Sequence, residues 1–400
     1  MVNLPKEKKT TEKDKQESTE QQPQPEETGK LRKQPFLARK LSNVTDYMLR
    51  FVNDKRKKLT PSWSYTTILT ELQKINDKLE ETPHVNFLSL LNSYKRVIDV
   101  LDGSISYFYR KRNTLWFKEF FPEEELYKLV KEDLERYHEK YGRINLTITK
   151  NGILIYDNYK KNQFNTLLMT VHGGKWVPNY GQELMAISEE KRYQEDDLGA
   201  DLIYGKLALD NGGVWISAKF SRFFCDLNRK RHGAIYSNTS EKRVQDIWKK
   251  ELTKYQKERI LKNYDQFYYI LETLVDTHRF NIIFDGHTMC YEPTRPSFSF
   301  GATCIPNFYS PIVEKMRNIL YKETGKRIHL NNPYKAGHIL NYLSKQYPDI
   351  FILSMEINKK LYMDKAHLKL KTKEINKLSN AIEKMFTFEK PESYNKRFSM

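Results

Sequence analysis

One apolar run that ends in a histidine and two glycines constrains the fold of this chain more than any other stretch. Residues 164–175 read FNTLLMTVHGGK, so the apolar run 167–171 leads directly into His172, Gly173 and Gly174. Such a run is typical of a buried strand, and the strands of an α/β sheet present functional side chains at their carboxyl ends. The glycines would let backbone and ligand come close together. Alone, the pattern also fits an ordinary strand-to-loop turn with an incidental histidine.

Similar short runs recur along the rest of the chain and alternate with helical patterns. Strands are predicted at residues 167–171, 214–218, 282–284, 327–330 and 350–355. Helices are predicted at residues 200–209, 242–277, 311–324, 335–346 and 371–385. A hairpin with Asn151-Gly152 at its turn precedes them. This alternation predicts an α/β fold with a mixed, mostly parallel sheet covered by helices.

The region before this alternation has a different composition. Residues 1–34 are rich in Lys, Glu and Gln with almost no apolar side chains, which predicts a disordered tail. Residues 35–142 carry apolar stripes at helical spacing, including a helix that starts near Pro122, and this predicts a helical N-terminal region. If the chain has a protein partner, we expect these helices to bind it. We therefore predict an α/β domain at residues 143–388 and a C-terminal tail at residues 389–400.

Charge and cysteine content limit the classes of function. The formal net charge of +17 favours attraction to anions. Lysines are spread through every predicted helix, often beside glutamates, and no zinc-finger or RNA-binding signature accompanies them, so we predict no specific nucleic-acid function. No apolar run of membrane length and no secretory h-region occurs. The three cysteines have no paired spacing, which suits a reducing compartment, and we expect a cytoplasmic protein.

Residues that can carry chemistry follow four of the predicted strands. In chain order they are His172; Asp196, Asp197 and Asp201; Arg222, Asp226, Asn228 and Arg229; Asp285 and His287; and Glu356. Two histidines and a carboxylate are the minimum for a catalytic zinc that keeps one position open for water. A glutamate between apolar neighbours suits a general base, and arginines suit a substrate carboxylate or an oxyanion. Each residue singly also fits a structural role, such as a core histidine at His287 or a salt bridge between Asp226 and Arg229.

The order of these motifs resembles that of the N-formylglutamate amidohydrolase family, which is itself similar in arrangement to zinc carboxypeptidases. The resemblance runs over roughly residues 164–366. It rests on six segments: His172-Gly173-Gly174 with Pro178, Asp197-Leu198-Gly199-Ala200-Asp201, Ser221-Arg222 with Asp226-Leu227-Asn228-Arg229, Asp285-Gly286-His287-Thr288-Met289, Asn332-Pro333-Tyr334-Lys335-Ala336-Gly337, and Glu356-Ile357-Asn358 with Leu361-Tyr362-Met363-Asp364. The third segment is the most specific of them.

The resemblance implies a ligand set for one Zn²⁺ ion. His172 and His287 would be two of the ligands, and we take Asp197 as the third. The next candidates for the third ligand are Asp196 and Asp201. Carboxypeptidases use His-x-x-Glu, but the last position of that motif is Lys175 here, which cannot ligate while charged.

The resemblance also implies which groups act on the substrate. Glu356 would be the general base, and Arg229 would join it in catalysis. Arg222 and Arg229 would bind a substrate carboxylate or the developing oxyanion, with Asn228 and Tyr334 also contacting the substrate. We therefore expect a zinc-dependent hydrolase that cleaves an N-formyl or N-acyl amide next to a carboxylate, with water activated by the metal and deprotonated by Glu356. Its substrate would be a small acidic N-acyl amino acid or an acidic peptide.

Two alternatives stay open at this point. One is a carboxypeptidase-type metallopeptidase that acts on acidic peptides, which a basic surface would attract. The other is a catalytically inactive scaffold of the same fold. It is suggested by Lys175, which stands where carboxypeptidases have the glutamate ligand. Thr288, Ala336 and Lys359 stand where the family more typically has serine, glycine and arginine, and these departures leave the substrate open.

Overall fold

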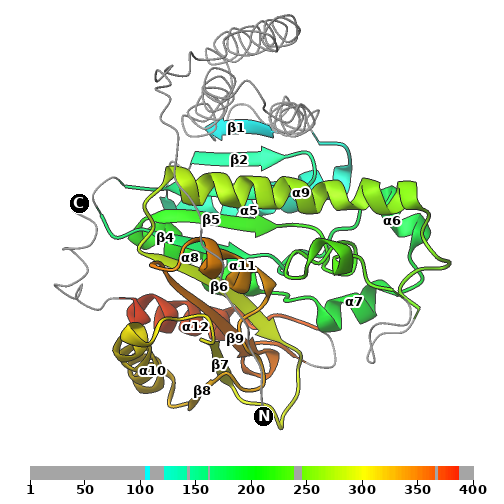
Figure 1. The fold of residues 1–400 in the computed structure, drawn as a ribbon. Coiled ribbons are helices and arrows are strands. Elements are labelled where there is room, and N and C mark those ends of the chain that lie inside the picture. Colours follow the sequence, from blue (N-terminus) through cyan, green and yellow to red (C-terminus); the bar gives the residue numbers. More distant parts are fainter. Residues whose placement is uncertain are drawn as a thin grey trace, which may run out of the picture.

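A single mixed sheet organises the part of the chain that the computed structural model describes, which is residues 104–108, 121–141, 145–160, 163–237, 246–364 and 368–386. Nine strands in these residues form the sheet in the order β1-β2-β3-β5-β4-β6-β9-β7-β8 (Figure 1). The strands are β1 (Ser104–Phe108), β2 (Asn145–Thr149), β3 (Ile153–Asn158), β4 (Thr166–Thr170), β5 (Gly213–Ala218), β6 (Ile282–Met289), β7 (Phe298–Gly301), β8 (Ile328–Leu330) and β9 (Phe351–Asn358). The predicted tails 1–34 and 389–400, and residues 35–103 of the predicted helical region, lie outside the described residues.

The four central strands of the sheet are parallel. β4 pairs in parallel with β5 and β6, and β6 pairs in parallel with β9. Every residue of β4 and β6 is buried, as expected of strands that are covered on both faces. Antiparallel pairs β1-β2, β2-β3 and β3-β5 extend one side, and β7 lies antiparallel to β9 on the other. The predicted α/β fold with a mixed sheet and covering helices is confirmed.

The helices cover both faces of this sheet. They are α5 (Glu124–Tyr141), α6 (Asn179–Leu184), α7 (Glu189–Glu195), α8 (Ala200–Asn211), α9 (Lys254–Thr277), α10 (Ser310–Thr324), α11 (His338–Gln346) and α12 (Thr372–Met385). Tyr137 of α5 donates to the Asp201 carbonyl of α8 at 3.2 Å, and Lys206 of α8 donates to Asn380 of α12 at 3.0 Å, so these three helices form one layer. Figure 1 shows α9 and α11 on the opposite face, in front of the sheet.

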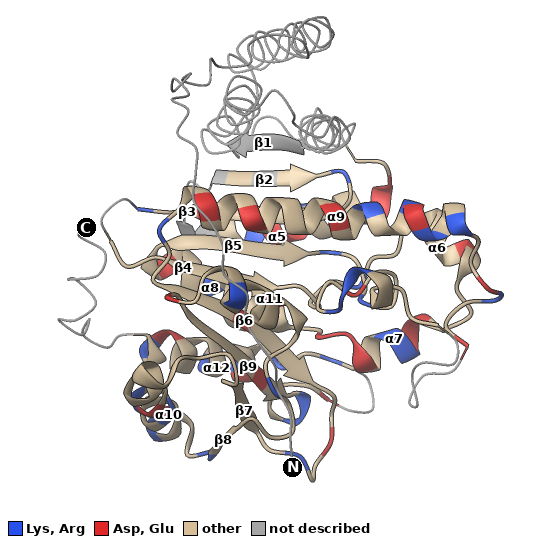
Figure 2. Ribbon diagram, in the orientation of Figure 1, with Lys and Arg blue, Asp and Glu red and all other residues tan. Residues whose placement is uncertain are grey.

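The outer helices carry charges of both signs. Basic and acidic residues are interspersed along α9 and α10 (Figure 2), as the mixed lysine and glutamate pattern predicts. In the described residues, no helix is long and apolar enough to cross a membrane.

Two strands continue further than predicted, and this places the site. The sequence predicts strands only to residues 284 and 355, but β6 continues to Met289 and β9 to Asn358. Asp, Gly, His and Glu have low strand propensity, yet eight consecutive residue pairs between β6 and β9 hold both strands extended. As a result, His287 and Glu356 lie opposite each other in adjacent strands rather than in separate loops.

Other element boundaries also differ from the predictions. The helix predicted from residue 242 begins at Lys254, where Thr253 and Gln256 form a capping box. The sequence analysis missed β7, a four-residue strand, and β1, which replaces helix within the predicted helical region. The predicted hairpin around Asn151-Gly152 and the helix after Pro122 are confirmed.

A buried ion network fastens α5 to the sheet. The Lys219 ammonium, at the end of β5, forms ion pairs with Asp133 of α5 and Asp201 of α8. Asp201 also accepts hydrogen bonds from Thr170 at 2.6 Å and Ser217 at 2.8 Å. Thus α5, which precedes the predicted domain boundary at 143, packs on the same sheet as the elements after it.

Candidate metal centre and active-site pocket

A pocket of about 540 Å³ lies at the carboxyl ends of the central strands. Its lining residues come from the segments after β4, β5 and α7, from the ends of β6 and β9, and from the segment before α11. All eight residues predicted for the site line it: His172, Asp197, Arg222, Asn228, Arg229, His287, Tyr334 and Glu356. The structure therefore brings the whole predicted set into one place.

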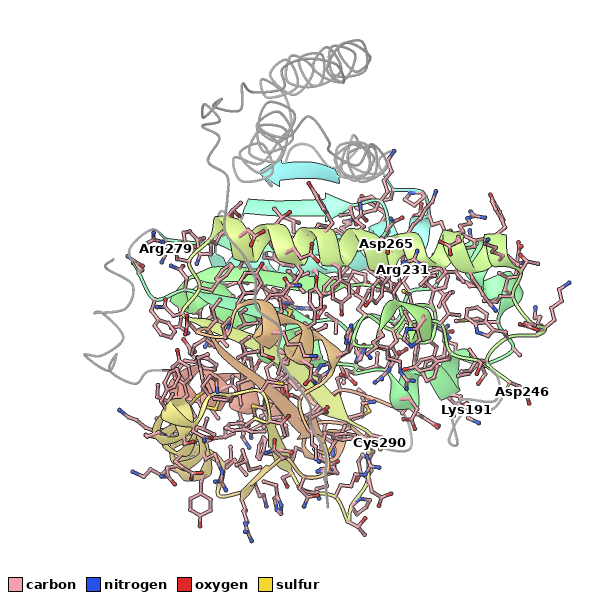
Figure 3. All side chains as sticks on the ribbon, viewed as in Figure 1. Lys191, Arg231, Asp246, Asp265, Arg279 and Cys290 are labelled. Carbon is pink, nitrogen blue, oxygen red and sulfur yellow. The ribbon has the colours of Figure 1, made fainter. Side chains whose placement is uncertain are left out.

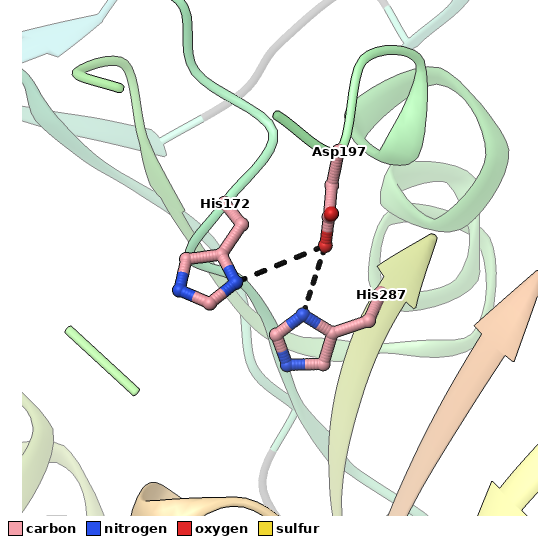
Figure 4. Close-up of side chains that lie close together, drawn as sticks. All are labelled: His172, Asp197 and His287. Atoms are coloured by element: carbon pink, nitrogen blue, oxygen red, sulfur yellow. Dashed lines mark hydrogen bonds and ion pairs between the residues drawn. The ribbon is translucent and has the colours of Figure 1, made fainter. Parts of the chain in front are cut away.

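His172, Asp197 and His287 lie side by side in this pocket (Figure 4). Each offers one ligand atom, and these atoms all lie within 4.8 Å of one another. Asp197 Oδ2 is 2.9 Å from His287 Nδ1 and 3.9 Å from His172 Nδ1. All three residues are buried. Two imidazole nitrogens and one carboxylate oxygen form a donor set that zinc takes while keeping a fourth position for water or substrate.

The glycines after His172 serve the packing of its loop. A Cβ atom on Gly174 would lie 2.2 Å from the Lys219 carbonyl carbon, and one on Gly173 would lie 2.8 Å from Asp201 Oδ1. These glycines were expected to admit a ligand, but the close neighbours are the end of β5 and a carboxylate of α8. Their small size lets the His172 loop lie directly on β5.

Each histidine is held from behind by a buried aspartate. His172 Nε2 lies 2.7 Å from Asp226 Oδ1, and His287 Nε2 lies 2.8 Å from Asp285 Oδ2. Histidine ligands of metal ions typically make such a second contact to a carboxylate, which fixes the ring and its tautomer. Within the described residues, the buried His172 Nδ1 has no hydrogen-bond partner, and a buried nitrogen of that kind needs one. These residues therefore fit a metal ion between His172, Asp197 and His287.

The protonation tendencies of the three side chains differ. Burial, helped by Arg222, lowers the pKa of His172 and favours the neutral imidazole that a metal needs. Against the effect of burial, Asp285 and the hydrogen bonds to Asp197 and Asp285 raise the pKa of His287 well above its usual range. Burial opposes ionisation of Asp197 too, but the hydrogen bond with His287 outweighs it and lowers that pKa. The Asp197 carboxyl therefore favours its ionised form, which is the form that binds a metal ion.

Replacing the aspartate behind His172 tests this second contact. Asp226→Asn is expected to weaken zinc binding about 10- to 100-fold, because the amide no longer supports the imidazole with a charge. The measurement is competition with a chelator of known affinity. The matched control is Asp265→Asn, which breaks an exposed ion pair of 2.8 Å with Arg231. Neither residue lines the pocket, and both are labelled in Figure 3. Equal zinc affinities in the two variants would contradict the role given to Asp226.

Two arginines after β5 form one wall of the pocket. Arg222 donates to Asp226 Oδ2 at 3.0 Å and to the Tyr236 hydroxyl at 3.2 Å. Arg229 Nε lies 3.4 Å from the same Asp226 oxygen, and its guanidinium lies 4.4 Å from the centre of the Tyr236 ring. Asp226 thus links His172 to both arginines. Guanidinium groups fixed in this way are preorganised for a carboxylate or an oxyanion.

Glu356 lines the pocket from β9, opposite His287 in the strand register. Burial and the nearby Asp197 raise the pKa of Glu356 to about 8, although His287 opposes the shift. A carboxyl group with a pKa near neutrality can both accept and return a proton at ordinary pH. Its position and its pKa therefore suit acid–base chemistry.

The reserve candidates for the third ligand lie elsewhere. Asp196 accepts a hydrogen bond from Ser221 at 2.9 Å, and Asp201 belongs to the ion network under α5. Neither of these, nor Lys175, lines the pocket. Asp196 and Asp201 therefore lie outside the group of converging ligand atoms.

Polar residues that sequence reasoning did not assign to the site also line the pocket, among them Glu195, Tyr236 and Arg295. Arg295 donates to Cys290 Sγ at 3.2 Å and to the Tyr334 hydroxyl, in the connection between β6 and β7. No motif surrounds Tyr236 or Arg295 in the sequence, and the strand that would have drawn attention to Arg295 was not predicted. Glu195 directly precedes Asp196 and Asp197 in an acidic stretch, and nothing in that stretch singles it out.

The fold and the pocket define a class: an α/β domain with a candidate His–Asp–His metal site at the carboxyl ends of parallel strands. The sequence profile of the N-formylglutamate amidohydrolase family matches residues 164–363, which is half of the 400-residue chain. The chain belongs to that family, as the motifs predict, and is an amidohydrolase enzyme. A search among curated proteins found no match.

Solved structures similar to this chain include three from bacteria. An N-formylglutamate amidohydrolase from Ralstonia eutropha JMP134 has 17% identity and a TM-score of 0.47, covering 58% of this chain and 96% of its own. A gene product from Agrobacterium tumefaciens has 15% identity and a TM-score of 0.45, and the match covers 62% of this chain and 97% of the other. A putative carboxypeptidase A from Shewanella denitrificans OS-217 has 9% identity and a TM-score of 0.35, and the match covers 64% of this chain and 66% of the other.

Proposed function

We propose that this chain is a zinc-dependent amidohydrolase that cleaves an N-formyl or N-acyl bond next to a carboxylate. One observation carries the proposal: two imidazoles and a carboxylate meet in the pocket, and a buried aspartate holds each imidazole from behind. His172, Asp197 and His287 would hold the ion. When bound, zinc supplies a Lewis acid that polarises a carbonyl and lowers the pKa of water.

Glu356 would act as the general base. Its carboxylate would take a proton from the attacking water and return it to the leaving nitrogen. Its place on β9, beside His287 on β6, supports this role because adjacent paired strands carry the base and a ligand. Two rigid strands hold such groups more accurately than loops do.

The arginine wall would hold the negative charges of the substrate and of the transition state. Arg222 and Arg229 would bind the substrate carboxylate and the developing oxyanion, with Arg229 contributing to catalysis. Asn228 lies beside them, with Nδ2 3.2 Å from His287 Nε2, and it would contact the same part of the substrate. Tyr334, whose hydroxyl accepts a hydrogen bond from Arg295, also lines the pocket and would contact the substrate.

Arg295 supports an acidic substrate. Its side chain bonds to a thiol and a phenol, and no carboxylate of the described residues forms an ion pair with it. A partly buried guanidinium with neutral partners favours an anion. Arg295→Met is therefore expected to reduce the preference for N-formylglutamate over N-formylglutamine, measured as kcat/KM, by about tenfold or more. Arg279→Met, at a surface position away from Cys290 in Figure 3, is the control and should keep the preference. An unchanged preference in Arg295→Met would contradict this use of Arg295.

Substrate comparison tests the proposed function. The zinc-supplied full chain is incubated with N-formylglutamate, N-acetylglutamate and an acidic tripeptide, and the release of formate, acetate or amino acid is measured. Hydrolysis of an N-acyl glutamate is the expected result. Cleavage of the tripeptide alone would favour the carboxypeptidase-type alternative, and no hydrolysis of any of them would favour the inactive scaffold. The proposal also places the protein in the cytoplasm, which its three free cysteines support.

A further inference from the structure

The residues directly after β9 contact two loops that are far apart in the sequence. β9 ends at Asn358, and a 3₁₀ turn, Lys359–Leu361, follows it. One loop, residues 194–197, ends α7 and leads into Asp197. The other loop, residues 290–297, joins β6 to β7 and carries Arg295. Both loops contribute to the lining of the pocket.

Lys359 holds the first loop by its backbone. The side chain is fully buried, and its ammonium donates to the Gln194 carbonyl at 2.7 Å and to the Asp196 carbonyl at 2.5 Å. These carbonyls lie at the end of α7, where a cation is favoured by the helix dipole. The second carbonyl belongs to the peptide bond that joins Asp196 to the candidate ligand Asp197. Lys359 therefore fixes the backbone from which the ligand projects.

Lys360 and Asn358 hold the second loop in the same manner. The Lys360 ammonium donates to the Pro293 carbonyl at 2.8 Å and to the Arg295 carbonyl at 2.6 Å. Asn358 Nδ2 donates to the Glu292 carbonyl at 2.8 Å, and its Oδ1 accepts the Lys360 backbone N–H at 3.0 Å. Two adjacent lysines thus reach in different directions, each to a pair of carbonyls.

The burial of Lys359 is costly and calls for a reason. Taking an ammonium out of water is expensive, and an ion pair with a carboxylate is the usual compensation. Lys359 forms no ion pair with any carboxylate in the described part of the chain, and its ammonium bonds instead to two backbone carbonyls. The two hydrogen bonds of Lys359 order the loop 194–197. A shift of this loop would displace the Asp197 carboxylate in the pocket.

We infer that Lys359 and Lys360 are positioning residues with separate effects: Lys359 sets the loop that carries Asp197, and Lys360 sets the loop that carries Arg295. The inference rests on the proposed function in one respect: that Asp197 binds the metal ion and Arg295 binds the substrate. It predicts that the two neighbouring lysines control different properties of one pocket. Loss of Lys359 changes metal binding, and loss of Lys360 changes substrate binding.

The first test follows the loops themselves. Amide hydrogen exchange is measured by mass spectrometry on the full chain without zinc or substrate, in wild type, Lys359→Met and Lys360→Met. Lys359→Met should exchange faster at residues 194–198 and unchanged at 292–297, and Lys360→Met should show the reverse. Lys359→Gln serves if the Met variant does not fold. Equal changes in both loops, or no change in either, would overturn the inference whether or not the protein is an enzyme.

The second test follows the two functions. Lys359→Met is expected to weaken zinc binding about tenfold, while Lys360→Met keeps the wild-type zinc affinity and raises KM for N-formylglutamate about tenfold. Lys359→Arg should restore zinc affinity, because a guanidinium also donates to two carbonyls. A merely structural role would lower stability in both variants without this separation. If wild type binds no zinc, the proposed function fails, and the exchange data still decide the inference.

Discussion

Glu356→Gln is expected to retain zinc and to lose activity by about 10²- to 10⁴-fold in kcat, the range that a general base contributes. The substitution keeps the shape of the side chain and removes the group that accepts a proton. Glu356 is not one of the three residues whose ligand atoms converge, so the metal site stays intact. The measurement combines kcat for N-formylglutamate with the zinc content of the same preparation.

The matched control for this variant is Glu195→Gln. Glu195 is another glutamate that lines the pocket, but it lies at the end of α7 rather than on β9. A variant that loses one pocket charge without losing the base should change kcat by less than about tenfold. Full activity in Glu356→Gln, or an equal loss in the two variants, would contradict the role of Glu356 as the base.

Lys219→Met is expected to destabilise the protein by about 3–5 kcal/mol, which is typical for removing one partner of a buried ion pair. The Lys219 side chain is only 7% exposed, and it pairs with both Asp133 and Asp201. Without the ammonium, two carboxylates remain buried near each other, and α5 loses its ionic contact with the sheet. Urea unfolding, read as the free energy of unfolding, measures the effect.

An exposed lysine provides the control for this stability prediction. Lys257 forms a 3.4 Å ion pair with Glu251, and the two side chains are 44% and 91% exposed. Exposed pairs contribute about 0–1 kcal/mol, so Lys257→Met should leave the unfolding free energy almost unchanged. If Lys219→Met were as stable as Lys257→Met, the network would not be what holds α5 on the sheet.

The sequence was sufficient to predict the central sheet and the residues that meet in the pocket. Apolar runs such as 167–171 are clear signals, because strands that are buried on both faces consist mostly of apolar residues. The chemistry-bearing residues follow these runs, so the meeting of the strand ends predicts that the side chains meet as well. The choice of Asp197 over its neighbours came from the resemblance rather than from the residues, since Asp196 and Asp201 are equally good donors in isolation.

Features that depend on long-range contacts could not be predicted. The end of β6 reads Asp-Gly-His-Thr-Met, which has no strand signal, and pairing with β9 holds it extended. Nothing in a one-dimensional pattern shows that Asp226 supports His172 or that Lys359 is buried against α7. Arg295 was missed because the short strand after it, β7, has four residues and no turn signal that separates it from a loop.

The central claim is that His172, Asp197 and His287 bind a catalytic metal ion, and metal content tests it most directly. Wild type and His172→Ala are purified in parallel, supplied with zinc, freed of loosely bound metal and examined by elemental analysis. The account predicts about one zinc per wild-type chain and almost none in the variant. A wild-type protein that holds no zinc after zinc is supplied, or a variant that holds as much as wild type, would contradict it.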